Sequence, residues 1–545
     1  MPKDQPIEGG ERSADDLFKS FKEVSITEFF RKNKAHLGYS GKVRSLTTVV
    51  HELVTNSLDA CEEAGILPDL ELNIKQLGVE HYRYSCRDNG PGIPAKHVSR
   101  VFGKMLAGTK FHRNIQLRGQ QGIGVAGVTM FSQMTTGKPV RIRTSIGDGD
   151  VHEIHLLVDV SKNEADIVET KIYKERWRGT EIIGELKGVL FNLSEQGPYE
   201  YLRRTAIANP HIRITFIDPE GRKSVFERAS KEIPKRPEEV KSHPKGMDVD
   251  EISNMAKKTS ATRVSSFLEN DFSRISKSKV NEIQSKVHFD LKKNPRKLSW
   301  SEAEELAKAF EAVDFMAPPI AGLCPIGEAQ VRKAVLNILK PEFEAVVERT
   351  PAVHSGGVPF QIEVAVAYGG NAGREITDGG MRTEVMRFSN RVPLLFDAGG
   401  CALQQAANSV DWKRYGIRDF DNSPFTVFIN LISTHIPYTS AGKQSVASDD
   451  EIVKEIRMAL MDVGRKFNRY HSRKRRDLER AERFNTLMRY SGELAKAISA
   501  LTGGDEKELE ERIKDIVTKK LKFTPQEEPD KKPGKKKKVE EGDEE

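Results

Sequence analysis

The stretch Ser45–Cys61, SLTTVVHELVTNSLDAC, carries the residues best suited to chemistry. Thr48, Glu52, Asn56 and Asp59 recur at helical spacing, which predicts a helix with a carboxylate one turn before a carboxamide. A carboxylate can act as general base toward water, and an amide oxygen is a hard ligand suited to Mg²⁺. Such a pair is also common on ordinary helix surfaces, so it does not identify a site by itself.

A strand end follows in His81–Ile93, HYRYSCRDNGPGI, where an alternating pattern breaks at Asp88. An aspartate there can accept from an exocyclic amine, the group that distinguishes adenine from guanine at that edge. Gly90 and Gly92 allow the backbone to pass close to a flat base. Taken alone, the segment is equally compatible with an ordinary Asp-rich turn.

A glycine-rich segment, Arg118–Gly127 (RGQQGIGVAG), predicts a loop that offers N–H groups to phosphates ahead of a helix from Val128. Thr109 and Lys110 add a hydroxyl and a cation just upstream. Three of the glycines also match the dinucleotide pattern G-x-G-x-x-G, with Asp148 about 20 positions on. Residues 111–121 do not supply the buried strand which that fold needs, so a Rossmann domain is the weaker alternative.

Four segments in order, HELVTNSLDA, DNGPGI, GQQGIG and RGTEI, resemble the nucleotide-binding boxes of the GHKL ATPases. This class includes gyrase B, histidine kinases, mismatch-repair ATPases and a group of heat-shock chaperones. The longer spellings HELVTNSLDAC and DNGPGIP, a basic helical insertion and the loop TSAGKQSVAS resemble the B subunits of type IIB topoisomerases more closely. That resemblance covers about residues 26 to 480.

The resemblance implies an α+β multidomain chain: a Bergerat-type (GHKL) α/β sandwich ATPase domain, a helix-two-turn-helix domain and a transducer domain with a β-α-β core. Residue patterns alone give only α/β for 26–230, helices for 245–313 and returning strands from about 320. The expected divisions are an arm at 1–25, the ATPase domain at 26–235, the helix-two-turn-helix domain at 243–315, the transducer with its long helix at 320–485, a helical segment at 486–523 and a disordered charged tail at 524–545.

Smaller features fix the expected ends of elements. Asp248, Ser301 with Glu304, and Ser448 with Glu451 are predicted helix caps. The long helix from Ser448 is expected to end near its basic run Arg473–Arg476. Strands are predicted around Phe360, Ile362, Val364 and Val366 and over Phe425–Ile436, and a last helix over 505–522.

Residue roles also follow from the resemblance. Glu52 is the implied general base, Asn56 the Mg²⁺ ligand and Asp88 the acceptor for the adenine amine. Lys443, in the loop AGKQS, corresponds to a switch lysine that reaches the γ-phosphate from the transducer; sequence chemistry alone would also allow a plain loop lysine. The remaining implied ATP contacts are Gly92, Thr109, Lys110, Gly119, Gln120, Gln121, Gly122, Ile123, Gly124, Val125, Ala126 and Thr180.

Composition narrows the class of protein. Four cysteines never approach a C-x-x-C spacing and no long apolar run occurs, so we expect a reduced, cytoplasmic protein that does not enter a membrane. The net charge is +7, and the segment Lys241–Lys297 holds most of it, with 13 Lys and Arg against 7 Asp and Glu. Such a face is typical of a phosphate-backbone partner, although it also suits a solvated helical surface.

The function implied is the ATP-hydrolysing subunit of a type IIB DNA topoisomerase that relaxes supercoiled DNA by double-strand passage. ATP would drive a B–B homodimer that closes on double-stranded DNA, helped by the arm with Phe18 and Phe21. A separate A subunit would cleave, in an A2B2 heterotetramer. The expected DNA contacts are Lys277, Lys279, Lys292 and Lys293, with Trp412–Tyr415 as the alternative. A histidine kinase and a DNA-independent dimer clamp are the competing functions.

Overall fold

The computed structural model describes residues 32–35, 37–104, 115–119, 124–159, 164–376, 379–440 and 442–521. The chain divides into two compact units, Met1–Arg465 and Lys466–Glu545. The first unit contains an α/β domain, a small helical domain and a domain built on a second sheet. The expected arm at 1–25 and tail at 524–545 lie outside the described residues.

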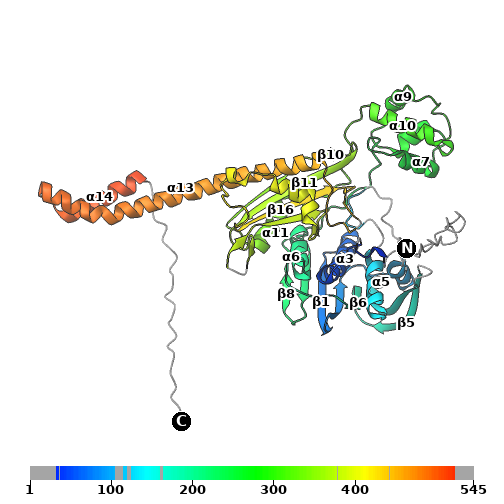
Figure 1. Ribbon diagram of the computed structural model, residues 1–545, viewed down its shortest axis with the longest axis horizontal. Helices are drawn as coiled ribbons and strands as arrows, with labels where there is room; N and C mark the ends of the chain where they lie inside the picture. The colour runs from blue at the N-terminus through cyan, green and yellow to red at the C-terminus, as the bar shows by residue number, and fades with distance from the viewer. Residues whose placement is uncertain are drawn as a thin grey trace, which may run out of the picture. The chain divides into compact units, whose positions relative to one another are not determined.

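The first domain is built on an eight-stranded sheet with the order β5-β4-β3-β6-β2-β1-β7-β8 (Figure 1). All neighbouring strands are antiparallel except β1 and β7, which are parallel. This largely antiparallel sheet rules out the Rossmann alternative, which needs a parallel one. Its strands are β1 (Asp69–Gly78), β2 (His81–Asp88), β3 (Val140–Ile146), β4 (Asp150–Asp159), β5 (Glu164–Lys174), β6 (Arg178–Lys187), β7 (Arg213–Ile217) and β8 (Lys223–Phe226).

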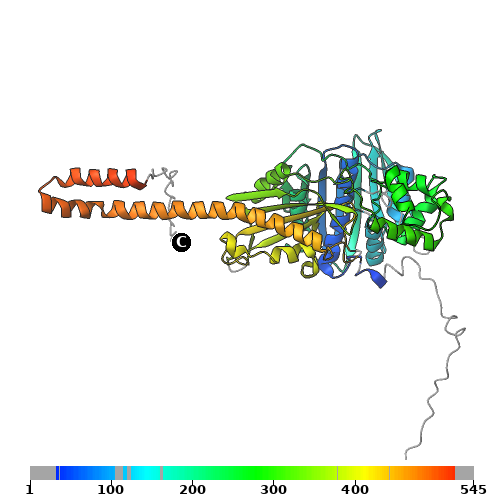
Figure 2. The ribbon, with the colours of Figure 1, turned by 90° about the horizontal axis from the view of Figure 1, so that it is seen from above.

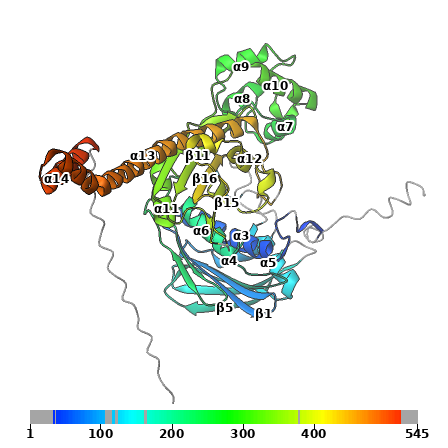
Figure 3. The same cartoon turned by 60° about the vertical axis from the view of Figure 1, so that its left-hand side comes forward.

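Four helices lie over one face of this sheet (Figure 3). They are α3 (Lys42–Glu63), α4 (Ala95–Gly103), α5 (Gly124–Thr136) and α6 (Pro198–Ala208). The predicted apolar stripe of α3, residues Leu46, Val49, Val50 and Leu53, is at most 1% exposed and packs in the core beneath. Burial of that stripe fixes the rotation of α3, and with it the direction of the polar residues between its turns.

The helical domain contains α7 (Val249–Lys258), α8 (Val264–Asp271), α9 (Lys277–Gln284), the short 3-10 helix η1 (Pro295–Lys297) and α10 (Trp300–Ala312), grouped together in Figure 2. Its core includes Phe267, Phe272 and Phe310. Asp248 caps α7 in a capping box with Glu251, as predicted. The cap of α10 is Ser299 with Glu302, so the prediction of Ser301 with Glu304 was wrong by two residues.

The second sheet of the first unit has the order β10-β11-β16-β14-β15, with β9 also pairing with β11. Strands β14 and β16 are parallel, and α12 lies in the connection between them, which gives the expected β-α-β core. The elements are α11 (Glu328–Leu339), β9 (Phe343–Glu348), β10 (Ala352–His354), β11 (Val358–Tyr368), β12 (Arg374–Glu375), β13 (Met381–Arg382), β14 (Glu384–Ser389), β15 (Val392–Leu394), η2 (Ala398–Gly400), α12 (Ala402–Asn408), η3 (Trp412–Tyr415) and β16 (Phe425–Ser433).

Helix α13 (Asp450–Thr502) starts in the first unit and continues through the second. It begins at Asp450, where Asp449, and not the predicted Ser448, accepts the N–H of Ile452. The basic run Arg473–Arg476 therefore lies in the middle of a helix, so the expectation that it complements the dipole of a helix end was wrong. The helix also crosses residue 485 unbroken, so the boundary expected there does not coincide with the end of an element.

In the second unit α13 runs beside α14 (Glu506–Leu521), as Figures 1 and 2 both show. The prediction of a last helix over 505–522 is thus confirmed. Phe484, Ser491 and Ala495 of α13 are buried, which marks the face that α14 covers.

Candidate active site

The adenine end of the predicted site is held by Asp88, the last residue of β2. Its Oδ1 accepts N–H groups from Gly90 at 2.9 Å and Thr180 at 3.0 Å. Its Oδ2 accepts the Ser57 hydroxyl at 3.1 Å. Because α3, β6 and the turn after β2 all supply donors, the carboxylate is fixed in one orientation, with Oδ2 as the atom on the α3 side.

Burial raises the pKa of Asp88, while the donors on Gly90, Thr180 and Ser57 oppose that rise. The side chain is only 7% exposed. A buried acceptor of this kind is stabilised by a further donor, of which an exocyclic amine is one example.

Gly92 closes the turn after Asp88 in a left-handed conformation, with φ 75°. A Cβ there would lie 2.0 Å from the carbonyl oxygen of Ser145. Only glycine therefore allows the turn to pack on β3. The other reason for a glycine here, the close approach of a base expected from the sequence, stays a prediction.

The phosphate end is formed where α3 meets the first turn of α5. A Cβ on Gly124 would lie 2.1 Å from Oε2 of Glu52, so the backbone of α5 starts directly against this carboxylate. Nδ2 of Asn56 donates to the carbonyl oxygen of Glu52 at 2.6 Å. The N–H groups at the start of α5 form a natural anion site beside a carboxylate and a carboxamide. This helix starts at Gly124 and not at Val128, so the prediction placed its N-terminus one turn too late.

The glycine loop is only partly described. Gly119 lies at one edge, and Gly124, Val125 and Ala126 belong to the first turn of α5. Thr109, Lys110, Gln120, Gln121, Gly122 and Ile123 lie outside the described residues.

Lys443 lies in the loop that follows β16 of the second sheet. Its backbone has φ 52°, and its N–H donates to the carbonyl of Ser440 at 3.1 Å. The pKa of His51 is lowered mainly by burial, with Glu52 opposing and the charge of Lys443 adding to the decrease. Lys443 is thus close enough to α3 to act electrostatically on the neighbour of Glu52. This proximity supports its assignment as switch lysine.

Sequence reasoning missed the groups that support these residues. Ser57 is separated from Asp88 by 31 positions, and nothing in the local pattern signals their hydrogen bond. Asp59, which was grouped with Glu52 and Asn56 by spacing, instead accepts Nη1 of Arg118 at 2.7 Å. Its buried ion pair is a structural feature of the far end of α3.

Two of the four lysines expected to contact DNA are engaged within the helical domain. Lys279 bonds Glu282 at 2.7 Å and Lys293 bonds Glu302 at 2.7 Å. Lys277 and Lys292 are exposed. In the alternative cluster, the rings of Trp412 and Tyr415 are buried, so they do not form a stacking surface for bases.

The fold and this site define an ATPase of the GHKL class. Residues 41–160 match the family described as histidine kinase-, DNA gyrase B-, and HSP90-like ATPase. Residues 318–483 match the family described as topoisomerase VI B subunit, transducer.

Proteins that are similar to this chain over nearly its whole length narrow the assignment from the ATPase class to one family. The chain is 47% identical to the B subunit of type 2 DNA topoisomerase 6 from Thermococcus sibiricus, over 93% of this chain and 97% of that protein. It is 49% identical to the protein of the same name from Thermococcus onnurineus, covering 91% and 95%. For the Methanothermobacter thermautotrophicus protein the identity is 47%, covering 94% and 98%.

The chain belongs to the family of type 2 DNA topoisomerase 6 B subunits. It is the ATPase subunit of a type IIB topoisomerase. Membership of this family decides against the two competing functions, a histidine kinase and a DNA-independent dimer clamp. In the described part of the chain, no helix has the length and apolarity needed to cross a membrane.

Proposed function

We propose that the chain hydrolyses ATP with Glu52 as the base that aligns and deprotonates water on the γ-phosphate. One observation carries this assignment. Helix α3 sets Glu52 and Asn56 against the first turn of α5, and one residue later Ser57 bonds the adenine-end carboxylate of Asp88. A single helix thus spans the site, so the residues proposed for base recognition and for water activation are held at a fixed distance from each other.

The polar groups around Asn56 fit a bound Mg²⁺. Because Nδ2 is committed to the carbonyl of Glu52, the amide oxygen is the atom that can face a cation. One protein oxygen is sufficient for an ion that keeps waters and takes phosphate oxygens as its other ligands. When bound, Mg²⁺ would offset charge on the phosphates. In the same proposal Lys443, Gly92, Thr180 and the loop from Gly119 to Ala126, with Thr109 and Lys110, hold the nucleotide.

The roles of Glu52 can be tested by E52A, with E63A on the exposed last residue of the same helix as control. Loss of a general base costs about 10²–10⁴-fold in rate. We expect hydrolysis to fall by this amount in E52A while the affinity for a non-hydrolysable ATP analogue is kept. E63A should hydrolyse normally. Normal turnover by E52A would overturn the assignment.

We further propose that the protein acts on double-stranded DNA, and therefore inside the cell, with a separate A subunit in an A2B2 assembly. ATP binding would join two B subunits and close them on DNA, and the A subunit would cut one duplex for passage of another. The exposed basic residues of the helical domain, Lys277 and Lys292 first among them, would contact phosphates, with Lys279 and Lys293 free to do so only if their ion pairs open.

A stripe of exposed apolar side chains lies on the second unit. Leu487, Tyr490, Leu494 and Leu501 of α13 are 47%, 56%, 51% and 86% exposed and recur at helical spacing. We propose that this stripe packs on the A subunit. L494D should then lose co-purification with the A subunit and keep ATP hydrolysis by the chain alone. Undiminished capture by L494D would place the contact elsewhere.

The overall function is tested by ATP hydrolysis of the chain with its A subunit, measured with and without duplex DNA. A topoisomerase of this kind should hydrolyse faster when duplex is present. Identical rates at every DNA concentration would contradict the DNA-dependent function.

A further inference from the structure

Helix α3, which carries Glu52, is held by the transducer near both of its ends. Near the start of α3, Arg44 donates to the two carboxylate oxygens of Asp397 at 3.0 and 2.9 Å. Its guanidinium also lies 4.7 Å from the centre of the Phe396 ring. Near the other end, Glu62 accepts Nη2 of Arg391 at 3.0 Å and Nη1 at 3.5 Å. Glu52 lies between these two contacts.

Both contacts come from one short segment, Asn390–Asp397, here called the clamp segment. Its middle is β15, and the residues that follow, Leu395 and Phe396, are buried in the core of the nucleotide-binding domain. At about 1.5 Å per residue, α3 covers about 27 Å between positions 44 and 62. The six steps from residue 391 to residue 397 cover at most about 20 Å, and the side chains of Arg44 and Arg391 supply the remainder. The segment therefore matches α3 in length.

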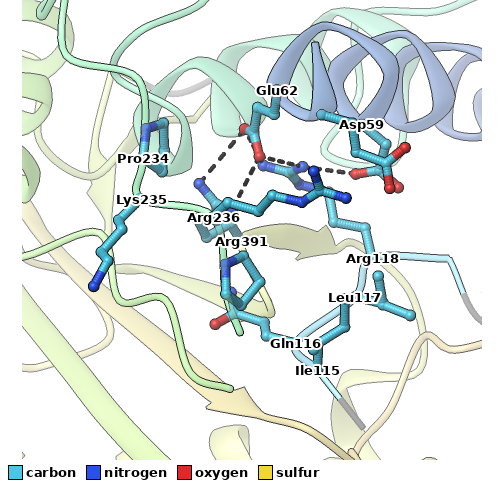
Figure 4. A pocket seen from close by; sticks show the side chains of 12 residues that line it. Asp59, Glu62, Ile115, Gln116, Leu117, Arg118, Pro234, Lys235, Arg236 and Arg391 are labelled. Atoms are coloured by element: carbon cyan, nitrogen blue, oxygen red, sulfur yellow. Dashed lines mark hydrogen bonds and ion pairs between the residues drawn. The ribbon is translucent and has the colours of Figure 1, made fainter. Parts of the chain in front are cut away.

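The clamp segment also reaches the edge of the glycine loop. Asn390 donates from Nδ2 to the carbonyl of Leu117 at 3.0 Å. The next residue, Arg118, is buried and bonds Glu62 at 2.6 and 3.0 Å, as the close-up in Figure 4 shows. Glu62 thus joins Arg391 of the transducer to Arg118, which directly precedes Gly119.

The charges at this junction are strongly coupled. Burial by itself would raise the pKa of Glu62, but Arg118 and Arg391 hold that pKa well below its usual range. The carboxylate also accepts Nε2 of His211 at 2.9 Å. A buried charge with several partners allows little displacement of any one of them, because separation would leave desolvated charge uncompensated.

The transducer, which contains the clamp segment, also carries Lys443. The loop with Lys443 follows β16, and Asn390 is bonded to β16 in three places: its N–H to the carbonyl of Leu431 at 2.8 Å, and its side chain to Ser433 in both directions, at 2.9 Å each. A movement of the transducer therefore moves Lys443 and the clamp segment together.

We propose that Arg391 and Asp397 are positioning residues for ATP hydrolysis: they hold the two ends of α3 so that Glu52 and Lys443 keep a fixed relation around the γ-phosphate. This inference rests on the roles proposed for Glu52 and Lys443. The transducer then controls hydrolysis through the catalytic helix as well as through its lysine. Both residues bond the ends of α3 and neither is among the proposed nucleotide contacts, so their loss should affect turnover and leave nucleotide binding intact.

The variants R391Q and D397N test this proposal in the full chain. Gln removes the charge of Arg391 and shortens its side chain, while Glu62 keeps its bonds to Arg118 and His211. Asn is tolerated at position 397, where φ is 54°. It removes the charge and replaces one of the two oxygens that accept from Arg44 by a donor, so the two-pronged contact is lost. R203Q is the control. Arg203 of α6 also bonds the transducer, at Glu384 and 2.7 Å, but its bonds to Glu200 and Glu384 do not involve the ends of α3 or the glycine loop.

We expect the kcat of R391Q and of D397N to fall about tenfold, since small misplacement of a catalytic group is costly. Their KM for ATP and analogue affinity should stay close to wild type at a temperature at which each variant is folded, and R391K should recover part of the kcat. R203Q should keep kcat. The inference fails if R391Q and D397N keep kcat within twofold, if they lose analogue binding in step with kcat, or if R203Q loses as much. E52A separates the two proposals: a slow E52A beside a normal R391Q overturns only this inference.

Discussion

Replacing Asp88 by asparagine probes nucleotide recognition at a single atom. Oδ1 accepts two backbone N–H groups, from Gly90 and Thr180, and an amide can satisfy them only with its oxygen. The amide nitrogen of D88N is therefore forced to the position of Oδ2. There it would face the amine of adenine, so donor would meet donor, while the Ser57 hydroxyl can rotate to accept.

The expected magnitude follows from the hydrogen bond that D88N removes. A hydrogen bond to a charged group contributes about 1.5–3 kcal/mol, which corresponds to about 10- to 150-fold in Kd. Guanine offers a carbonyl oxygen at the same edge and would now meet a donor. The preference for ATP over GTP should thus shrink more than ATP affinity alone falls.

Calorimetric titration with non-hydrolysable ATP and GTP analogues measures both quantities. D218N is the matched control, because Asp218 is 6% exposed and also accepts two backbone N–H groups at Oδ1, from Glu220 and Arg222. It lies in the turn between β7 and β8, away from the site. Unchanged nucleotide preference in D88N, or an equal loss of ATP affinity in D218N, would refute the reasoning.

Other consequences can be measured with the same protein. Because burial raises the pKa of free Asp88 and a bound amine favours its ionised form, ATP affinity should weaken as pH falls through that raised pKa, and D88N should lose this dependence; a pH-independent wild type would contradict it. K443A should slow hydrolysis far more than analogue binding, and normal turnover would remove Lys443 from the site. A non-hydrolysable analogue should drive dimers in sedimentation, and deletion of residues 1–25 should weaken them; an unchanged monomer fraction would count against the arm. K277E/K292E should weaken the salt dependence of DNA binding: the slope of the logarithm of the binding constant against log salt should fall by about 0.9 for each phosphate that is no longer neutralised. K223E/K231E makes the same charge change at exposed lysines of the nucleotide-binding domain and should leave that slope unchanged.

Local patterns were sufficient to predict the elements that carry the site. Helical spacing identified α3 and its buried stripe, and strand alternation ending at Asp88 identified β2. These succeed because side-chain period and turn residues act over a few positions. The sandwich topology and the β-α-β core came from the resemblance to known ATPases, and the strand order was not predicted at all, because strand pairing depends on contacts between distant segments.

Errors occurred where two local patterns compete and where distant contacts decide which residues meet. The capping pattern at Ser301 and Glu304 was plausible, yet Ser299 and Glu302 satisfy the same rule two residues earlier. Similarly, the spacing that grouped Asp59 with Glu52 could not reveal Arg118, which binds Asp59 from 59 positions away. The links of α3 to Arg391 and Asp397 join residues more than 300 positions apart and leave no local signal.

The central claim, that ATP hydrolysis by this chain drives DNA passage, is tested most directly by relaxation of supercoiled plasmid. The chain would be combined with its A subunit, duplex plasmid, Mg²⁺ and ATP. We predict relaxation in steps of two linking numbers, as double-strand passage requires, which depends on ATP and is lost when E52A replaces the wild-type chain. Relaxation that proceeds equally without ATP, or equally with E52A, would contradict the account.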